Sequence, residues 1–162
     1  RALSGKPYVG SLTLGGTVPV AYHKIHVHKS EAVYFQADNK VGLLEHKGAT
    51  LGLAICADLN FPSHAAHAAS CGADVYAASA LISVEGYDRE AKMLQGYART
   101  YNIAVLLSNY ASKSGPYTPP GGSAIWAPGG DRVAIVSDTQ EALVLATRTP
   151  NGWEGKVMVL PG

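Results

Sequence analysis

Cys56 stands where a reactive thiol is expected in an α/β protein. It follows a short apolar run, residues 51–55, that predicts a buried strand, and it precedes a turn and an alanine-rich stretch that predicts a helix. Reactive groups of open α/β sheets lie at the carboxyl ends of the strands. The position suits a nucleophile as well as a buried structural thiol, and the neighbouring groups must decide between the two.

Lys24 is the best cationic partner for such a thiol. It lies in the segment Tyr-His-Lys-Ile-His-Val-His of residues 22–28. If residues 17–28 form one long strand, Lys24, His26 and His28 share one face. An amine near the sulfur would favour the thiolate and could hold the negative oxygen of a tetrahedral intermediate. The alternative is an ordinary exposed lysine on an edge strand.

The histidines raise two other possibilities, a metal site and a Cys-His pair. His26 and His28 could bind zinc from one strand face, and His64 and His67 follow later. No acidic or cysteine partner stands at ligand spacing, and the HExxH pattern is absent. Nothing around Cys56 resembles the local signatures of cysteine proteases. We therefore expect no metal and rank a Cys-His pair low.

Composition limits the partners and the compartment. The 162 residues are 47% apolar and 15% charged, with a net charge of +1. This balance gives no attraction for nucleic acid or an anionic membrane, and no apolar run is long enough to span a bilayer. Two cysteines make no disulfide framework, which favours a reducing, cytoplasmic location. Cys71 is expected to be a small buried residue of the helix after Cys56.

The elements that must position these groups alternate between strand and helix in the middle of the chain. Residues 1–162 are expected to form a single domain of the α/β or α+β class, with a layered sheet. Residues 1–4 resemble the end of a helix, and residues 15–16 a hairpin turn. The expected helices are residues 63–70 and 87–101. The expected strands are residues 8–14, 17–28, 41–45, 49–56, 74–79, 103–108, 123–127, 132–137, 142–148 and the tail 156–160.

Several blocks of the sequence, in order and at matching spacing, resemble the nitrilase (carbon–nitrogen hydrolase) superfamily. The first surrounds Lys24, the second contains Glu31, and the third covers residues 52–62 around Cys56. The later blocks are Gly72-Ala73-Asp74, Ser79-Ala80, residues 102–109 and residues 122–130. The match extends from about the first expected strand to near the end of the chain.

The resemblance implies an α/β fold, an α-β-β-α layered sandwich, here expected to lack the N-terminal third. It implies a hydrolase of non-peptide carbon–nitrogen bonds, of the amide, nitrile or carbamoyl type. The reaction proceeds through a cysteine thioester and uses no metal or organic cofactor. Family members commonly form oligomers, so we expect a small-molecule amide or nitrile substrate and a homo-oligomer.

The resemblance also implies roles for individual residues. Cys56 matches the nucleophile, Lys24 the lysine that stabilises the oxyanion, and Glu31 a second glutamate that orients the substrate or the lysine. Further residues on the substrate or oxyanion side are Ala57, through its backbone N–H, Ser79 and Ala80.

The sequence departs from the family pattern at the general base. The family places this glutamate on a segment well before the lysine, and the sequence contains no such segment. Ser63 and Ala66 also replace a glutamate and an arginine that are usual after the Phe-Pro pair. The alternative function is therefore a non-catalytic protein that retains the fold for binding or assembly.

Overall fold

The computed structural model describes residues 5–15 and 19–160. The predicted helix end at residues 1–4 lies outside the described residues, and so does residue 16 of the predicted turn at residues 15–16. The helices are η1, a 3-10 helix (Cys56–Asn60), α1 (Pro62–Ser70) and α2 (Val84–Tyr101). The strands are β1 (Gly10–Thr13), β2 (Val20–His23), β3 (Gly42–His46), β4 (Ala49–Ile55), β5 (Val75–Ala80), β6 (Ala104–Asn109), β7 (Ala124–Trp126), β8 (Arg132–Ile135), β9 (Ala142–Thr149) and β10 (Gly152–Val159).

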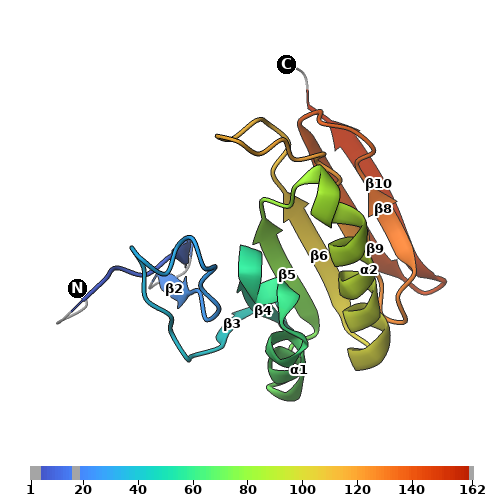
Figure 1. Ribbon diagram of the computed structural model, residues 1–162. Helices are drawn as coiled ribbons and strands as arrows, with labels where there is room; N and C mark the ends of the chain where they lie inside the picture. Colours follow the sequence, from blue (N-terminus) through green and yellow to red (C-terminus); the bar gives the residue numbers. More distant parts are fainter. Residues whose placement is uncertain (1–4, 16–18, 161–162) are drawn as a thin grey trace.

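A six-stranded sheet forms the centre of the fold, in the order β3-β4-β5-β6-β7-β8. Strands β4, β5 and β6 run parallel, and the other neighbours pair antiparallel. Parallel neighbours need a crossover connection, and α1 and α2 supply the two crossovers. Figure 1 shows both helices lying in front of the central strands. The carboxyl ends of β4, β5 and β6 therefore meet at one edge, where η1 begins.

The core lies between the helices and this sheet. Its largest buried side chains include Tyr76 of β5, Leu94 of α2 and Val105 of β6, each with no exposed surface. Gly52 of β4 lets α1 approach closely, since a side-chain carbon at this position would lie 2.8 Å from the Cβ of Ala68. Small residues on both elements thus fix α1, and the turn before it, against the sheet.

The opposite face of the sheet carries two hairpins, β1-β2 and β9-β10. Strand β2 contacts β3, β9 contacts β7 and β8, and β10 contacts β8. The described residues leave the middle of this face open over β5 and β6, between the hairpins. The described layers are thus helices, a complete sheet and a partly filled second β layer, which agree with three of the four layers of the predicted α-β-β-α sandwich.

The long strand predicted for residues 17–28 is wrong, since β2 ends at His23. Beyond that point the backbone N–H groups of Ile25 and His26 donate to the Asp58 carboxylate and not to a neighbouring strand. The shared strand face expected for Lys24, His26 and His28 therefore does not form.

Other boundaries differ by smaller amounts. Helix α2 begins one turn earlier than predicted, at Val84, and ends before Asn102, whose φ of 52° is the left-handed conformation that commonly terminates helices. The last strand begins at Gly152, four residues before the predicted tail. None of the described helices is both long enough and apolar enough to span a membrane.

Candidate active site

Cys56 is the first residue of η1, directly after the end of β4, and its backbone is strained. Its φ is 47°, in the left-handed region that residues other than glycine rarely adopt. Strained backbone of this kind gathers at functional sites, and nucleophiles of α/β hydrolases stand on comparable strand-to-helix turns. The side chain is half-buried. The structure thus confirms the predicted position of Cys56 at the end of a strand.

Lys24 is fully buried and paired with Glu31. Its side chain has no exposed surface, and Nζ donates to Oε2 of Glu31 at 2.5 Å. The backbone N–H of His28 donates to the same oxygen at 2.9 Å. Burial alone would raise the pKa of the Glu31 carboxyl, but the hydrogen bonds from Lys24 and His28 outweigh it and hold the pKa below its usual value. An exposed edge-strand lysine is therefore excluded.

Asp58, two residues after Cys56, joins the segments that carry Cys56 and Lys24. Its carboxylate is fully buried. One oxygen accepts from the backbone N–H groups of Ile25 at 3.1 Å and His26 at 2.7 Å, and the other accepts from that of Ile55 at 3.0 Å. A buried carboxylate needs several donors to remain stable, and here the backbone supplies three.

A buried hydrogen-bond chain continues from Asp58 into the core. The Tyr22 hydroxyl donates to Asp58 at 2.6 Å and lies 3.0 Å from Nε2 of His64, whose Nδ1 lies 2.8 Å from the Tyr76 hydroxyl. Burial lowers the pKa of His64 and raises the pKa of both tyrosines, with Asp58 adding to the shift of Tyr22. Because the Tyr22 hydroxyl donates to Asp58, a neutral His64 ring fits this chain by donating from Nε2 to Tyr22 and accepting at Nδ1 from Tyr76.

Ala57 and Ala80 lie beside the same edge of the sheet, as does Ser79. Ala57 is the second residue of η1 and is buried, whereas Ala80 is half-buried at the end of β5. Ser79 is paired in register with Ile55, the residue before Cys56. The structure therefore places all three near the carboxyl end of β4, while their predicted roles toward a substrate stay predictions.

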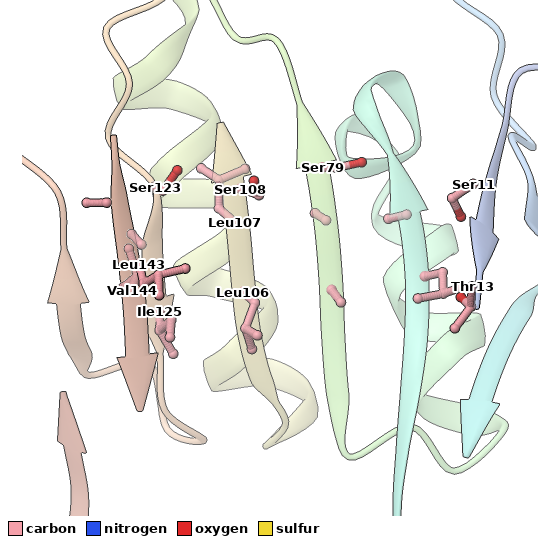
Figure 2. A pocket seen from close by; sticks show the side chains of 16 residues that line it. Ser11, Thr13, Ser79, Leu106, Leu107, Ser108, Ser123, Ile125, Leu143 and Val144 are labelled. Atoms are coloured by element: carbon pink, nitrogen blue, oxygen red, sulfur yellow. The ribbon is translucent and has the colours of Figure 1, made fainter. Parts of the chain in front are cut away.

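Ser79 also lines a trough on the helix-free face, which encloses about 450 Å³. Strands β4 to β7 form the floor of the trough, β1 forms one wall and β9 the other. Figure 2 shows Ser11 and Thr13 on the first wall, and Leu143 and Val144 on the second. Cys56, Lys24 and Glu31 are not among its lining residues. The trough is thus an open sheet face beside the candidate site.

Among the described residues, other glutamates do not pair with the Lys24 ammonium. Glu45 and Glu85 are exposed, and Glu90 pairs with Arg89. Within residues 5–15 and 19–160, the carboxylate that contacts the Lys24 ammonium is that of Glu31.

His26 and His28, predicted to share a strand face, lie in different environments. The ring of His26 stacks on Phe61 with centroids 3.8 Å apart, whereas His28 is exposed and bonds Ser30. The described part of the chain contains no cluster of three His, Cys, Asp or Glu side chains that could hold a metal. Cys71, expected to be buried, is exposed because it caps α1 beyond its last turn.

Sequence reasoning missed Asp58, Tyr22 and His64 as members of the site. Asp58 and Tyr22 belong to the quoted blocks around Cys56 and Lys24, so their spacing was a usable signal. His64 carried no comparable signal, since a histidine in an alanine-rich helix is compatible with many environments.

Comparison with known proteins places the chain among relatives of this fold. Residues 4–155 match the protein family described as carbon-nitrogen hydrolase. No curated protein matches the chain. Saccharomyces cerevisiae Nit3, a member of branch 10 of the nitrilase superfamily, superposes with a TM-score of 0.75 at 22% identity, covering 83% of this chain and 51% of that one.

Two further solved structures are similar. A mutant of the Nesterenkonia AN1 amidase, from the nitrilase superfamily, has a TM-score of 0.68 at 21% identity and covers 74% of this chain and 46% of its own. Glutamine-dependent NAD+ synthetase from Acinetobacter baumannii has a TM-score of 0.84 at 16% identity, over 100% of this chain and 32% of that one. The likeness confirms the predicted fold, and the chain spans about half the length of the first two proteins.

Proposed function

Because the chain belongs to the carbon–nitrogen hydrolase family, we propose that it hydrolyses a non-peptide carbon–nitrogen bond of an amide, nitrile or carbamoyl compound, with Cys56 as nucleophile. The observation that carries the proposal is the left-handed φ of 47° at Cys56. The backbone N–H of Ile55, just before this residue, and that of Ile25, just after Lys24, both donate to the Asp58 carboxylate. Strained non-glycine backbone of this kind is enriched at functional sites, which supports a functional role for this turn.

For an amide substrate, the proposed chemistry proceeds in two steps. Sγ of Cys56 attacks the carbonyl carbon, and the negative oxygen is held by the Lys24 ammonium and the Ala57 N–H. The carbon–nitrogen bond then breaks, the amine leaves with a proton, and a thioester remains. Water attacks the thioester, the carbon–sulfur bond breaks, and the products are the carboxylic acid and the free thiol.

A general base is needed to take the proton in the first step and to activate water in the second. We place this base on polypeptide outside the 162 residues, in line with the family pattern. The support is that Glu31, the carboxylate in contact with Lys24, already accepts hydrogen bonds from Lys24 and His28. A positioned base contributes about 10²–10⁴-fold to the rate, so turnover by these residues alone is expected to be slow.

Covalent capture tests the nucleophile without requiring turnover. Two mutants of the Nesterenkonia sp. AN1 amidase show covalent addition of the acetamide moiety of fluoroacetamide at the active-site cysteine. We expect Cys56 to capture the same moiety at least about tenfold faster than Cys71, by peptide mass spectrometry at neutral pH. Cys71 is an exposed cysteine of the same chain and is thus an internal reference.

The outcome separates the proposal from its alternative. Cys56→Ala should abolish the fast adduct, and Cys71→Ala should leave it unchanged. Equal labelling of the two cysteines, or amidase activity that survives in Cys56→Ala, would contradict a catalytic Cys56. Equal labelling without any amidase activity would favour a non-catalytic protein that retains the fold for binding or assembly.

We further propose that the protein associates with itself through its helix-free face. Apolar side chains are exposed on the β9-β10 hairpin, among them Leu143, Leu145 and Val159. Uncovered apolar strands favour association. Sedimentation velocity should show species larger than a monomer whose share rises with concentration, and Leu143→Lys should reduce that share. A single monomeric boundary at high concentration contradicts this proposal.

We also propose a reducing, cytoplasmic compartment. The support is that both cysteines are unpaired, one of them exposed.

A further inference from the structure

We propose that Asp58 is a positioning residue, which holds the backbone beside Lys24 and the backbone beside Cys56 at one place and affects the reaction through Lys24. The inference rests on the proposed function, because it takes Cys56 and Lys24 as the reacting pair. Asp58 itself donates no group to the reaction.

The hydrogen bonds of Asp58 reach the immediate neighbours of both reacting residues. Ile25 directly follows Lys24, and its N–H donates to Oδ1 at 3.1 Å, as does that of His26 at 2.7 Å. Ile55 directly precedes Cys56, and its N–H donates to Oδ2 at 3.0 Å. Two segments that lie far apart in the sequence thus meet on the two oxygens of one carboxylate.

Burial makes this junction rigid. Asp58 has no exposed surface, so water cannot replace a lost donor. Two side chains also contact the Asp58 carboxylate. The Tyr22 hydroxyl lies 2.6 Å from Oδ2, and Nδ1 of His26 lies 3.2 Å from Oδ1. Hydrogen bonds to an ionised acceptor are stronger than neutral ones, and their loss inside a protein is correspondingly severe. Any shift of either segment would break at least one of them.

The arrangement requires a carboxylate and not merely a polar side chain. Both oxygens of Asp58 accept, whereas asparagine has one acceptor oxygen and an amide NH₂ that would face N–H or O–H donors. Asp58→Asn therefore keeps the volume of the side chain but releases one of the two segments. The expected consequence is displacement of the Lys24 amine from Cys56.

A double-mutant cycle measures whether Asp58 acts through Lys24. The readout is the alkylation rate of Cys56 by iodoacetamide, relative to Cys71 in the same molecule. Lys24→Met removes the ammonium and Asp58→Asn displaces it, and each is expected to slow Cys56 by about tenfold or more. Displacement of a reacting group by about 1 Å can by itself lower a rate by 10²-fold. The double variant should be no slower than the slower single variant.

Asp74→Asn is the matched control. Asp74 also accepts a backbone N–H of β4, that of Thr50 at 2.8 Å, but at the opposite end of the strand. This variant should leave the Cys56 rate unchanged. A slowing equal to that of Asp58→Asn would show a general effect of lost stability and would overturn the proposal.

The cycle also distinguishes this proposal from the proposed function. If Lys24→Met slows Cys56 by the same factor in the native chain and in the Asp58→Asn variant, Asp58 does not act through Lys24, and only the positioning role fails. If Lys24→Met leaves the Cys56 rate unchanged in the otherwise native chain, the role of Lys24 fails and the positioning role falls with it.

Tyr22→Phe keeps the proposal testable if Asp58→Asn does not fold. It removes one donor to Asp58 and retains the buried ring. It should slow Cys56 less than Asp58→Asn does, and not at all in the Lys24→Met background. Equal slowing in both backgrounds would overturn the proposal.

Discussion

Replacement of Lys24 by methionine is expected to slow alkylation of Cys56 by about tenfold or more, because a neighbouring cation assists attack by a thiol nucleophile. The Lys24 side chain has no exposed surface, so its ammonium acts in a medium of lower effective dielectric than water. Methionine retains most of the length and the apolar contacts of the lysine stem, so the change removes the charge with little loss of packing.

Lys6→Met is the matched control for this prediction. Lys6 is exposed, and its Nζ donates to the carbonyl of Ala32, beside Glu31, at 2.5 Å. Exposed charges are screened and contribute little, so the Cys56 rate should change by less than about twofold. Rates are measured with iodoacetamide at neutral pH, with folding checked by circular dichroism. Equal slowing in the two variants would show that Lys24 has no special relation to the thiol.

Glu31→Gln is expected to lower the free energy of unfolding by about 2–3 kcal/mol, because it leaves the buried Lys24 ammonium without a counter-charge. The value lies below that of a fully buried pair because 30% of the Glu31 side chain is exposed. The double variant Lys24→Met/Glu31→Gln should recover at least half of the loss, since it removes both charges together. Urea denaturation of the three variants and the native chain measures these differences.

The same ion pair predicts a dependence on pH. The pKa of Glu31 is lower in the folded protein than its ordinary value of 4.5. Its contribution to stability is therefore complete above pH 4.5 and is lost as the pH falls through the lowered pKa. The stability difference between the native chain and Glu31→Gln should be constant near neutrality and shrink in acid. A difference that persists unchanged at strongly acidic pH would contradict a lowered pKa.

Much of the fold could be predicted from local patterns. The buried strand before Cys56, the helix opened by Pro62 and the long helix ending at Tyr101 each follow from apolar periodicity and end signals that lie within a few residues of one another. The ordered blocks around Lys24, Glu31 and Cys56 pointed to the carbon–nitrogen hydrolase family, and the family match over residues 4–155 confirms it.

The strand predicted for residues 17–28 failed for a long-range reason. Its alternation of polar and apolar residues is real, but the donors that a strand would pair are bonded to Asp58, on a distant part of the chain. A carboxylate from another element can accept the hydrogen bonds that a neighbouring strand would otherwise accept. A local sequence pattern does not predict this, because the carboxylate lies far away in the sequence.

By itself, the sequence determined the class of the fold, the family, and the identity of a thiol at the end of a strand, since these depend on residue types and on spacing within one element. Only the tertiary structure decided that Lys24 is buried against Glu31, that Cys56 takes a left-handed backbone, and that Asp58 joins the two segments. Those features depend on hydrogen bonds and burial between elements distant in the chain, which exist only once the layers have packed.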